Sequence, residues 1–245
     1  MKVAKTRYER EGVELENVFS ALNRYKGKYL HFTNADKLGI NVKGVYPGIN
    51  PIGIYGYAID NELISSIVEG QHSFFVSNME SVNLYRYLYI FDAKGKTLDL
   101  NKLDQNEFKN IIKEMIQHDM VLAPAVPDTL EEKVQEYINR MRRVHPPQNS
   151  YADHFRHTLG EALMHSGIGN DHLAVNVILR KIGYDAVKGF ISAGHTDEIC
   201  IINPRALVVL DKLQNPIFDE YEYKKVQQYR LERAANAYYE KAIQT

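Results

Sequence analysis

The 245-residue sequence predicts an α+β fold. Three observations predict it: β-prone runs dominate the first part of the chain, apolar residues at helical spacing fill the middle, and Ile- and Val-rich runs return after Gly183. Segregated strands and helices favour α+β over a doubly wound α/β protein. We expect one domain over residues 1–245, with a helical insertion at about 104–182 and a C-terminal helix at about 219–243.

The first elements follow from apolar spacing and turn residues. Val13–Tyr25 is expected to be a helix, because its apolar residues recur at helical spacing and Gly27 suits a helix end. Strong β-propensity predicts strands over Tyr29–Phe32, Ile52–Ile59, Ser73–Ser77 and Leu84–Phe91. Gly39–Pro51 is rich in turn formers and is expected to be a binding loop. The first half is therefore expected to be mostly sheet.

The second half begins with helices. Asp104 suits the N-cap of the first one, and Gly183 suits the end of the last. The expected helices run from Asp104 through Ile116, Pro127–Val144, Tyr151–His165 and Asp171–Ile182. Strands are expected over Asp185–Phe190, Glu198–Ile202 and Ala206–Leu210, and the charged segment Asp219–Ile243 is expected to form a long docking helix.

Composition limits the function classes. A net charge of −1 gives no general attraction to nucleic acids. No apolar run is long enough to span a membrane, and the charged N-terminus lacks the apolar core of a secretory signal. Cys200 is the single cysteine, so no intramolecular disulfide can form. We expect a soluble, cytoplasmic protein without a membrane partner, which could still act in a host cell by another route.

Two distant blocks carry the candidate chemistry. The first runs from His31 through a Gly- and Pro-rich loop to Gly-Ile-Tyr-Gly-Tyr at residues 53–57, and the second leads from Gly183 to Glu198 and an Ile-rich strand. His31, Tyr55 and Glu198 each stand at a strand edge, and we expect them to converge on one cleft. No Rossmann or Walker glycine motif is present.

These blocks resemble the ADP-ribosyltransferase fold, most closely the domain found in polyvalent proteins of phages and plasmids. The resemblance implies two small facing sheets around an NAD cleft. It implies that His31 hydrogen-bonds a ribose hydroxyl of the adenosine half, that the backbone of Phe32 holds the carboxamide and that Tyr55 lies against nicotinamide. Glu198 would be the catalytic carboxylate, which stabilises the oxocarbenium-like sugar when nicotinamide leaves.

Thr33, Gly53 and Phe75 complete the expected NAD-binding set. The sequence departs from the resembling family in two places. Ser66 stands where many relatives have a second stacking tyrosine, so we expect Phe74 or Phe75 to form that wall. Thr196 stands where relatives carry the residue that indicates the acceptor. His195 and Asp197 flank the site and could orient or deprotonate an acceptor nucleophile, although both are more typical of solvated loop residues.

The expected function is a mono-ADP-ribosyltransferase that consumes NAD and modifies a macromolecule, with protein favoured over RNA or DNA. The resemblance suggests a toxin, effector or phage-type modifier, with an antitoxin or inhibitor as a further partner. An NAD glycohydrolase and an inactive binding module of the same fold are the alternatives. Nucleic acid as acceptor would use the basic cluster of Arg140, Arg142, Arg143 and His145.

A metal site is the less favoured interpretation of the histidines. His154, His157, Glu161 and His165 fall on one face of an expected helix. No cysteine cluster or His-Glu-x-x-His motif accompanies them, and zinc sites usually need a further ligand from elsewhere. We expect no metal.

Overall fold

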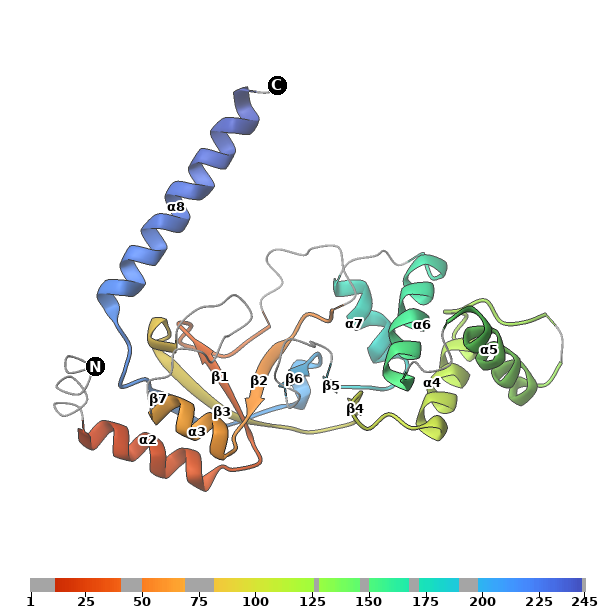
Figure 1. Ribbon diagram of the computed structural model, residues 1–245, viewed down its shortest axis with the longest axis horizontal. Helices are drawn as coiled ribbons and strands as arrows, with labels where there is room; N and C mark the ends of the chain where they lie inside the picture. The colour runs from red at the N-terminus through yellow and green to blue at the C-terminus, as the bar shows by residue number, and fades with distance from the viewer. Residues whose placement is uncertain are drawn as a thin grey trace. The chain divides into compact units, whose positions relative to one another are not determined.

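The computed structural model describes residues 12–40, 50–68, 82–125, 128–145, 150–167, 172–189 and 198–243 (Figure 1). The chain divides into two compact units. Unit 1 comprises residues 1–38, 58–91 and 209–245, and unit 2 comprises residues 39–57 and 92–208. Both units combine helices with strands, which confirms the expected α+β class.

Unit 2 contains the helical block and four strands. Its helices are α4 (Gln105–Gln117), α5 (Leu130–Val144), α6 (Tyr151–His165) and α7 (His172–Lys181). Its strands follow the order β4 (Thr97–Asp99), β5 (Ala186–Lys188), β6 (Glu198–Ile201) and β2 (Ile54–Ala58). β4 and β5 are parallel, whereas β5–β6 and β6–β2 are antiparallel. The short turn η2 (Pro204–Ala206) follows β6.

Side-chain caps fix where the helices of unit 2 begin. The Asp104 carboxylate accepts a hydrogen bond from the backbone N–H of Glu107, and Ser150 with Asp153 forms a reciprocal capping box at α6. The apolar faces of the four helices and of β4–β6 then enclose one buried core. Its largest members include Phe108, Tyr137, Phe155, Tyr184 and Leu98.

Asp185 ties the strands of unit 2 together. Its carboxylate accepts hydrogen bonds from the Lys96 backbone N–H at 3.1 Å and from Asn203 Nδ2 at 2.7 Å, and it also pairs with Arg180. These donors lower the pKa of the Asp185 carboxyl, the Asn203 side chain contributing most. The carboxylate thereby links the loop before β4, the end of α7 and the turn after β6.

Unit 1 contains α2 (Gly12–Arg24), α3 (Asn61–Val68), η1 (Val82–Leu84) and α8 (Glu220–Ile243). Its strands follow the order β1 (Tyr29–Thr33), β3 (Tyr87–Ala93) and β7 (Leu207–Gln214), with β1 and β3 antiparallel. Helices α2 and α3 contact each other. None of the helices that the structure describes is long and apolar enough to cross a membrane.

Side chains alternate between the two faces of the β1–β3 pair, and Phe91 and Tyr89 are buried like the aliphatic residues of the other face. Leu30, Phe32, Leu88 and Ile90 are almost completely buried and belong to the apolar interior of unit 1. The alternate positions point to the opposite face, where each β1 residue meets a β3 residue directly. The pairs on that face are Tyr29 with Phe91, His31 with Tyr89 and Thr33 with Tyr87.

Several expected elements need correction. The first half is not mostly sheet, because Asn61–Val68 forms the helix α3. The Asp60 carboxylate caps the start of α3 by accepting a hydrogen bond from the Leu63 backbone N–H at 2.7 Å. Residues 82–84 form a 3-10 turn, so the strand expected from Leu84 begins at Tyr87. Helix α5 begins at Leu130, because Thr129 is its N-cap.

Other expected elements are confirmed. The helices over residues 13–25, 151–165, 171–182 and 219–243 agree with α2, α6, α7 and α8 to within about one residue. The strand expected over Ser73–Ser77 and much of the Gly39–Pro51 loop lie outside the described residues. The three-residue strand β4 was not expected at all.

Candidate functional site

Glu198 and Tyr57 form the central pair of the candidate site in unit 2. Glu198 is the first residue of β6, and its Cα is the direct partner of Tyr57 on β2. Directly opposed residues of antiparallel strands project from the same face of the sheet. Glu198 is 8% exposed and Tyr57 is 7% exposed. The sequence-predicted catalytic carboxyl is therefore buried beside a phenol.

Burial changes the acidity of the Glu198 carboxyl. It raises the pKa of Glu198 to about 7, because the charged form loses its hydration. The same burial, together with the negative charge of Glu198, raises the pKa of Tyr57 and keeps that phenol neutral. A carboxyl that is half ionised near neutral pH and sits on a strand end is typical of functional sites.

Tyr55 is the second tyrosine on this face, two residues before Tyr57. Its Cα pairs with that of Cys200, and its hydroxyl donates a hydrogen bond to the Pro51 carbonyl at 2.5 Å. The ring packs against the core of unit 2 and stays partly exposed. Burial is also the main cause of the raised pKa values of Tyr55 and Cys200. Tyr55 is thus a fixed neutral ring, and Cys200 is an inert packing thiol rather than a nucleophile.

Gly53 lies where the backbones of two strands approach closely. A Cβ at this position would stand 2.3 Å from the Ile201 carbonyl oxygen and 2.5 Å from Cys200 Sγ. Only glycine fits there without moving the backbone. The expected NAD-binding residue Gly53 thus has a demonstrable structural role in bringing β2 against β6.

Asn176 of α7 fixes the segment that leads into β2. Its Oδ1 accepts from the Ile52 backbone N–H at 2.9 Å, and its Nδ2 donates to the Ile52 carbonyl at 2.5 Å. The side-chain amide therefore satisfies both polar groups of one backbone unit, as a neighbouring strand would. Sequence reasoning missed this residue, since a contact between positions 124 apart leaves no local signal.

His31, Phe32 and Thr33 belong to unit 1. His31 is partly exposed and lies directly opposite the buried Tyr89. The Phe32 side chain is 2% exposed, and Phe32 pairs with Leu88 in the β1–β3 ladder, so its expected contact with the carboxamide stays a prediction. Thr33 Oγ1 accepts from the Ala35 N–H at 3.1 Å and begins the turn after β1.

Some expected site residues lie outside the described structure. They are Phe74, Phe75, His195, Thr196 and Asp197. Ser66 is described as part of α3, so the position that carries a second stacking tyrosine in many resembling proteins is helical in this chain.

Two histidines of α6, His154 and His157, pack against other side chains, whereas His165 is exposed. The His157 ring stacks on His145 with centroids 3.7 Å apart and planes 13° apart, while His154 is buried. Burial chiefly lowers the pKa of His154, and the neighbouring cationic groups add to this. Glu161 accepts from the Tyr137 hydroxyl at 2.9 Å and from Arg140 at 3.0 Å. Within the described ranges, no cluster of three or more His, Cys, Asp and Glu is arranged to hold a metal ion.

The three arginines of the basic cluster each contact another side chain of unit 2. Arg140 pairs with Glu161 at 3.0 Å and Arg143 with Glu136 at 2.5 Å. Arg142 donates to the Tyr151 hydroxyl at 3.0 Å. Two of the three guanidinium groups thus form ion pairs with carboxylates of the same unit.

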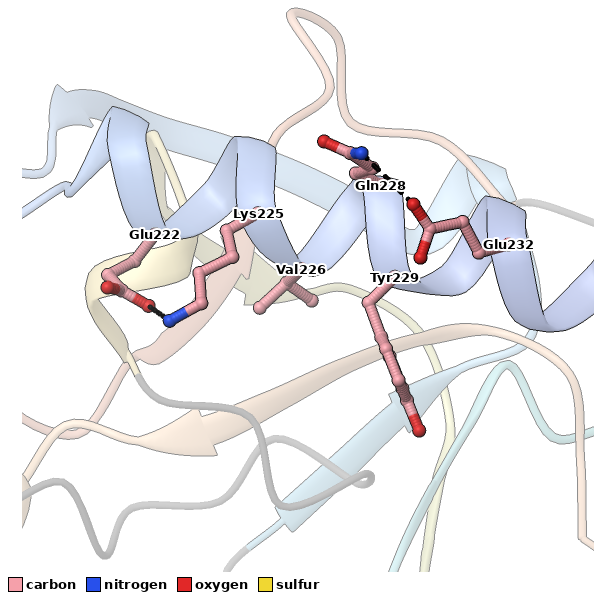
Figure 2. A pocket seen from close by; sticks show the side chains of 6 residues that line it. All are labelled: Glu222, Lys225, Val226, Gln228, Tyr229 and Glu232. Atoms are coloured by element: carbon pink, nitrogen blue, oxygen red, sulfur yellow. Dashed lines mark hydrogen bonds and ion pairs between the residues drawn. The ribbon is translucent and has the colours of Figure 1, made fainter.

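Figure 2 shows a shallow hollow along α8 in unit 1. Its lining includes Val226 and Tyr229, and it is bordered by two contacts within the helix, Lys225 with Glu222 and Gln228 with Glu232. A second hollow lies between α4 and α5, next to the ion pair of Lys113 and Glu131. None of the described residues that line these hollows is a sequence-predicted site residue.

No family model matches this chain, and no curated protein or solved structure matches it either. The candidate site is accordingly defined by its own residues. In unit 2 the described structure brings together Glu198 of β6, Tyr55 and Tyr57 of β2, and Gly53 just before β2. In unit 1 it places His31 on an aromatic sheet face beside Tyr89.

Proposed function

We propose that this protein is an NAD-dependent mono-ADP-ribosyltransferase with a fold of the ADP-ribosyltransferase type. The observation that carries the proposal is the buried Glu198 carboxyl, whose pKa is about 7, paired across the strands with Tyr57 and followed along β2 by Tyr55. The resemblance of the sequence around His31, Tyr55 and Glu198 supports the same activity.

The chemistry of Glu198 fits this reaction. When the bond between ribose C1′ and the nicotinamide nitrogen breaks, its electron pair leaves with nicotinamide and positive charge develops on the sugar. A carboxylate in a poorly hydrated site stabilises that charge more strongly than one in water. An acceptor nucleophile then bonds to C1′ and releases its proton, so that ADP-ribose is transferred.

The tyrosines supply a surface for the positively charged nicotinamide ring. A neutral phenol ring attracts a pyridinium cation through its π-face, and burial keeps Tyr55 neutral. The hydrogen bond from its hydroxyl to Pro51 fixes the ring plane in advance. In unit 1, His31 takes a ribose hydroxyl of the adenosine half, because a neutral imidazole offers one donor and one acceptor.

Protein is the favoured acceptor. The net charge of −1 gives little general attraction to a nucleic-acid backbone. We propose a role as a toxin, effector or phage-type modifier, acting in the cytoplasm of the cell that contains the acceptor. An inhibitory partner would then protect the producing cell.

The experiment that tests this function measures nicotinamide release from NAD by the purified protein and by Glu198→Gln. Cell extract is then added, either untreated or treated with nuclease or protease, and transfer of labelled ADP-ribose is followed. Release that depends on Glu198 and labelling that protease abolishes are the expected results. Free ADP-ribose without labelled macromolecule would instead identify an NAD glycohydrolase. Absence of both release and NAD binding would leave an inactive binding module.

A further inference from the structure

Lys212 of β7 is held over the aromatic face of unit 1. Its Nζ lies 4.1 Å from the ring centroid of Tyr87 and 5.5 Å from that of Tyr89. The two rings meet edge to face with centroids 6.5 Å apart. Tyr89 is the direct cross-strand partner of His31, and Tyr87 is that of Thr33. A fixed cation therefore stands on the same sheet face as His31.

The partner of this cation is the Asp36 side chain from the turn after β1. Lys212 Nζ donates to Asp36 Oδ1 at 2.5 Å and to the Asp36 carbonyl at 2.9 Å. The hydrogen bond between Asp36 and Lys212 is the main cause that lowers the pKa of Asp36, and it is also the main cause that raises the pKa of Lys212. Both groups are therefore charged at neutral pH, and Lys37 adds a second positive charge near the Asp36 carboxylate.

The two ends of this ion pair are held differently. The Lys212 side chain is 33% exposed and is confined by two rings, whereas the Asp36 side chain is 78% exposed. Exposed ion pairs contribute little to stability, because water hydrates the separated charges well. The Asp36 carboxylate can therefore be replaced by another anion at low cost.

The backbone around Asp36 does not depend on its carboxylate. The Asp36 carbonyl accepts from the Tyr89 hydroxyl as well as from Lys212. Asn34 clamps the same turn to a distant segment, donating to the Leu84 carbonyl at 2.9 Å and accepting from the Arg86 N–H at 2.8 Å. The carboxylate can thus swing into water while the turn remains in place.

We propose that Lys212 is a phosphate-binding residue, and that the Asp36 carboxylate occupies the anion position until the diphosphate of an ADP-ribosyl ligand displaces it. This inference rests on the proposed function, in which His31 on the same sheet face takes a ribose hydroxyl next to that diphosphate. The ammonium group supplies a point charge suited to phosphate oxygens. Tyr87 and Tyr89 hold it in position before the ligand binds.

Titration calorimetry of the full chain with ADP-ribose and with adenosine tests the assignment. Lys212→Met is expected to weaken ADP-ribose binding about tenfold, which corresponds to the loss of one charge-assisted hydrogen bond. The same variant is expected to leave adenosine binding unchanged. Lys212→Arg keeps the charge and is expected to bind ADP-ribose within about twofold of the wild type. Asp36→Asn removes only the competing carboxylate and is expected to strengthen ADP-ribose binding.

The opposite directions of the two single variants separate binding from structure. If Asp36→Asn weakened ADP-ribose binding as much as Lys212→Met, the pair would be a structural contact and the assignment would be overturned. Equal loss of adenosine binding, or no ADP-ribose binding by the wild type, would overturn it as well. Nicotinamide release is measured separately, so failure of this assignment is distinguishable from failure of the proposed activity.

Discussion

Tyr57 and Glu198 face each other as a direct cross-strand pair of β2 and β6, and both side chains are more than nine-tenths buried. This position makes the carboxyl of Glu198 a weak acid and places it next to a phenol that stays neutral. The pairing leads to predictions about activity and stability whose dependences on pH have opposite signs.

Activity is expected to rise with pH through the pKa of Glu198. Only the carboxylate stabilises a cationic sugar, and a pKa of about 7 leaves it mostly protonated at lower pH. We expect kcat/KM for nicotinamide release to increase by about tenfold from about pH 6 to about pH 8 and then to level off. Glu198→Gln should remove both the activity and this profile. Glu131→Gln changes an exposed acid of unit 2 and is expected to retain both.

Stability is expected to change in the opposite direction. Burial raises the pKa of Glu198 from 4.5 to about 7, so the folded state binds more protons than the unfolded state between these values. The free energy of unfolding therefore falls as pH rises through this window and is constant above it. Relative to wild type, Glu198→Gln should gain up to about 3 kcal/mol between pH 4 and pH 8. Urea denaturation of both proteins at each pH measures the gain, and a constant difference would contradict a raised pKa.

Two glycines form a matched pair for substitution by alanine. Gly53→Ala is expected to destabilise the protein by about 2–4 kcal/mol, because the new methyl group would overlap the Ile201 carbonyl and Cys200. Gly160 lies in α6 with open space where its Cβ would be, and Gly160→Ala is expected to stabilise by about 0.5–1 kcal/mol. Thermal unfolding of the two variants compares them directly. Equal effects would show that β2 and β6 do not approach closely at Gly53.

Asn176→Ala is expected to destabilise the protein by about 1–3 kcal/mol, since it removes the partner of the partly buried backbone N–H and C=O groups of Ile52. Asn176→Asp keeps the acceptor for the Ile52 N–H but turns a second oxygen toward the Ile52 carbonyl, so it should destabilise at least as much. Urea denaturation measures both variants. An unchanged free energy of unfolding for Asn176→Ala would mean that water fully replaces the hydrogen bonds of the amide.

The local sequence determined much of the helical block. Ser150 and Asp153 form a capping box because a hydroxyl and a carboxylate three residues apart satisfy each other's backbone N–H groups, so the start of α6 could be predicted. Apolar residues from Phe108 to Ile116 mark the buried face of α4 in the same way. The alternation within β1 likewise separates His31 from the buried Leu30 and Phe32.

Other features were decided by the tertiary structure alone. Residues 61–68 form a helix although the segment ends in β-branched residues, and β4 exists only because β5 lies alongside it. Three contacts join residues that are far apart in sequence. Glu198 pairs with Tyr57, and the Asn176 amide bonds to Ile52. The Lys212 ammonium group lies between Tyr87 and Asp36. Local periodicity indicates which face of an element is buried. The partner of a residue across a sheet is decided only when distant segments pack together. The acidity of a buried carboxyl is decided at the same point, because that packing excludes water.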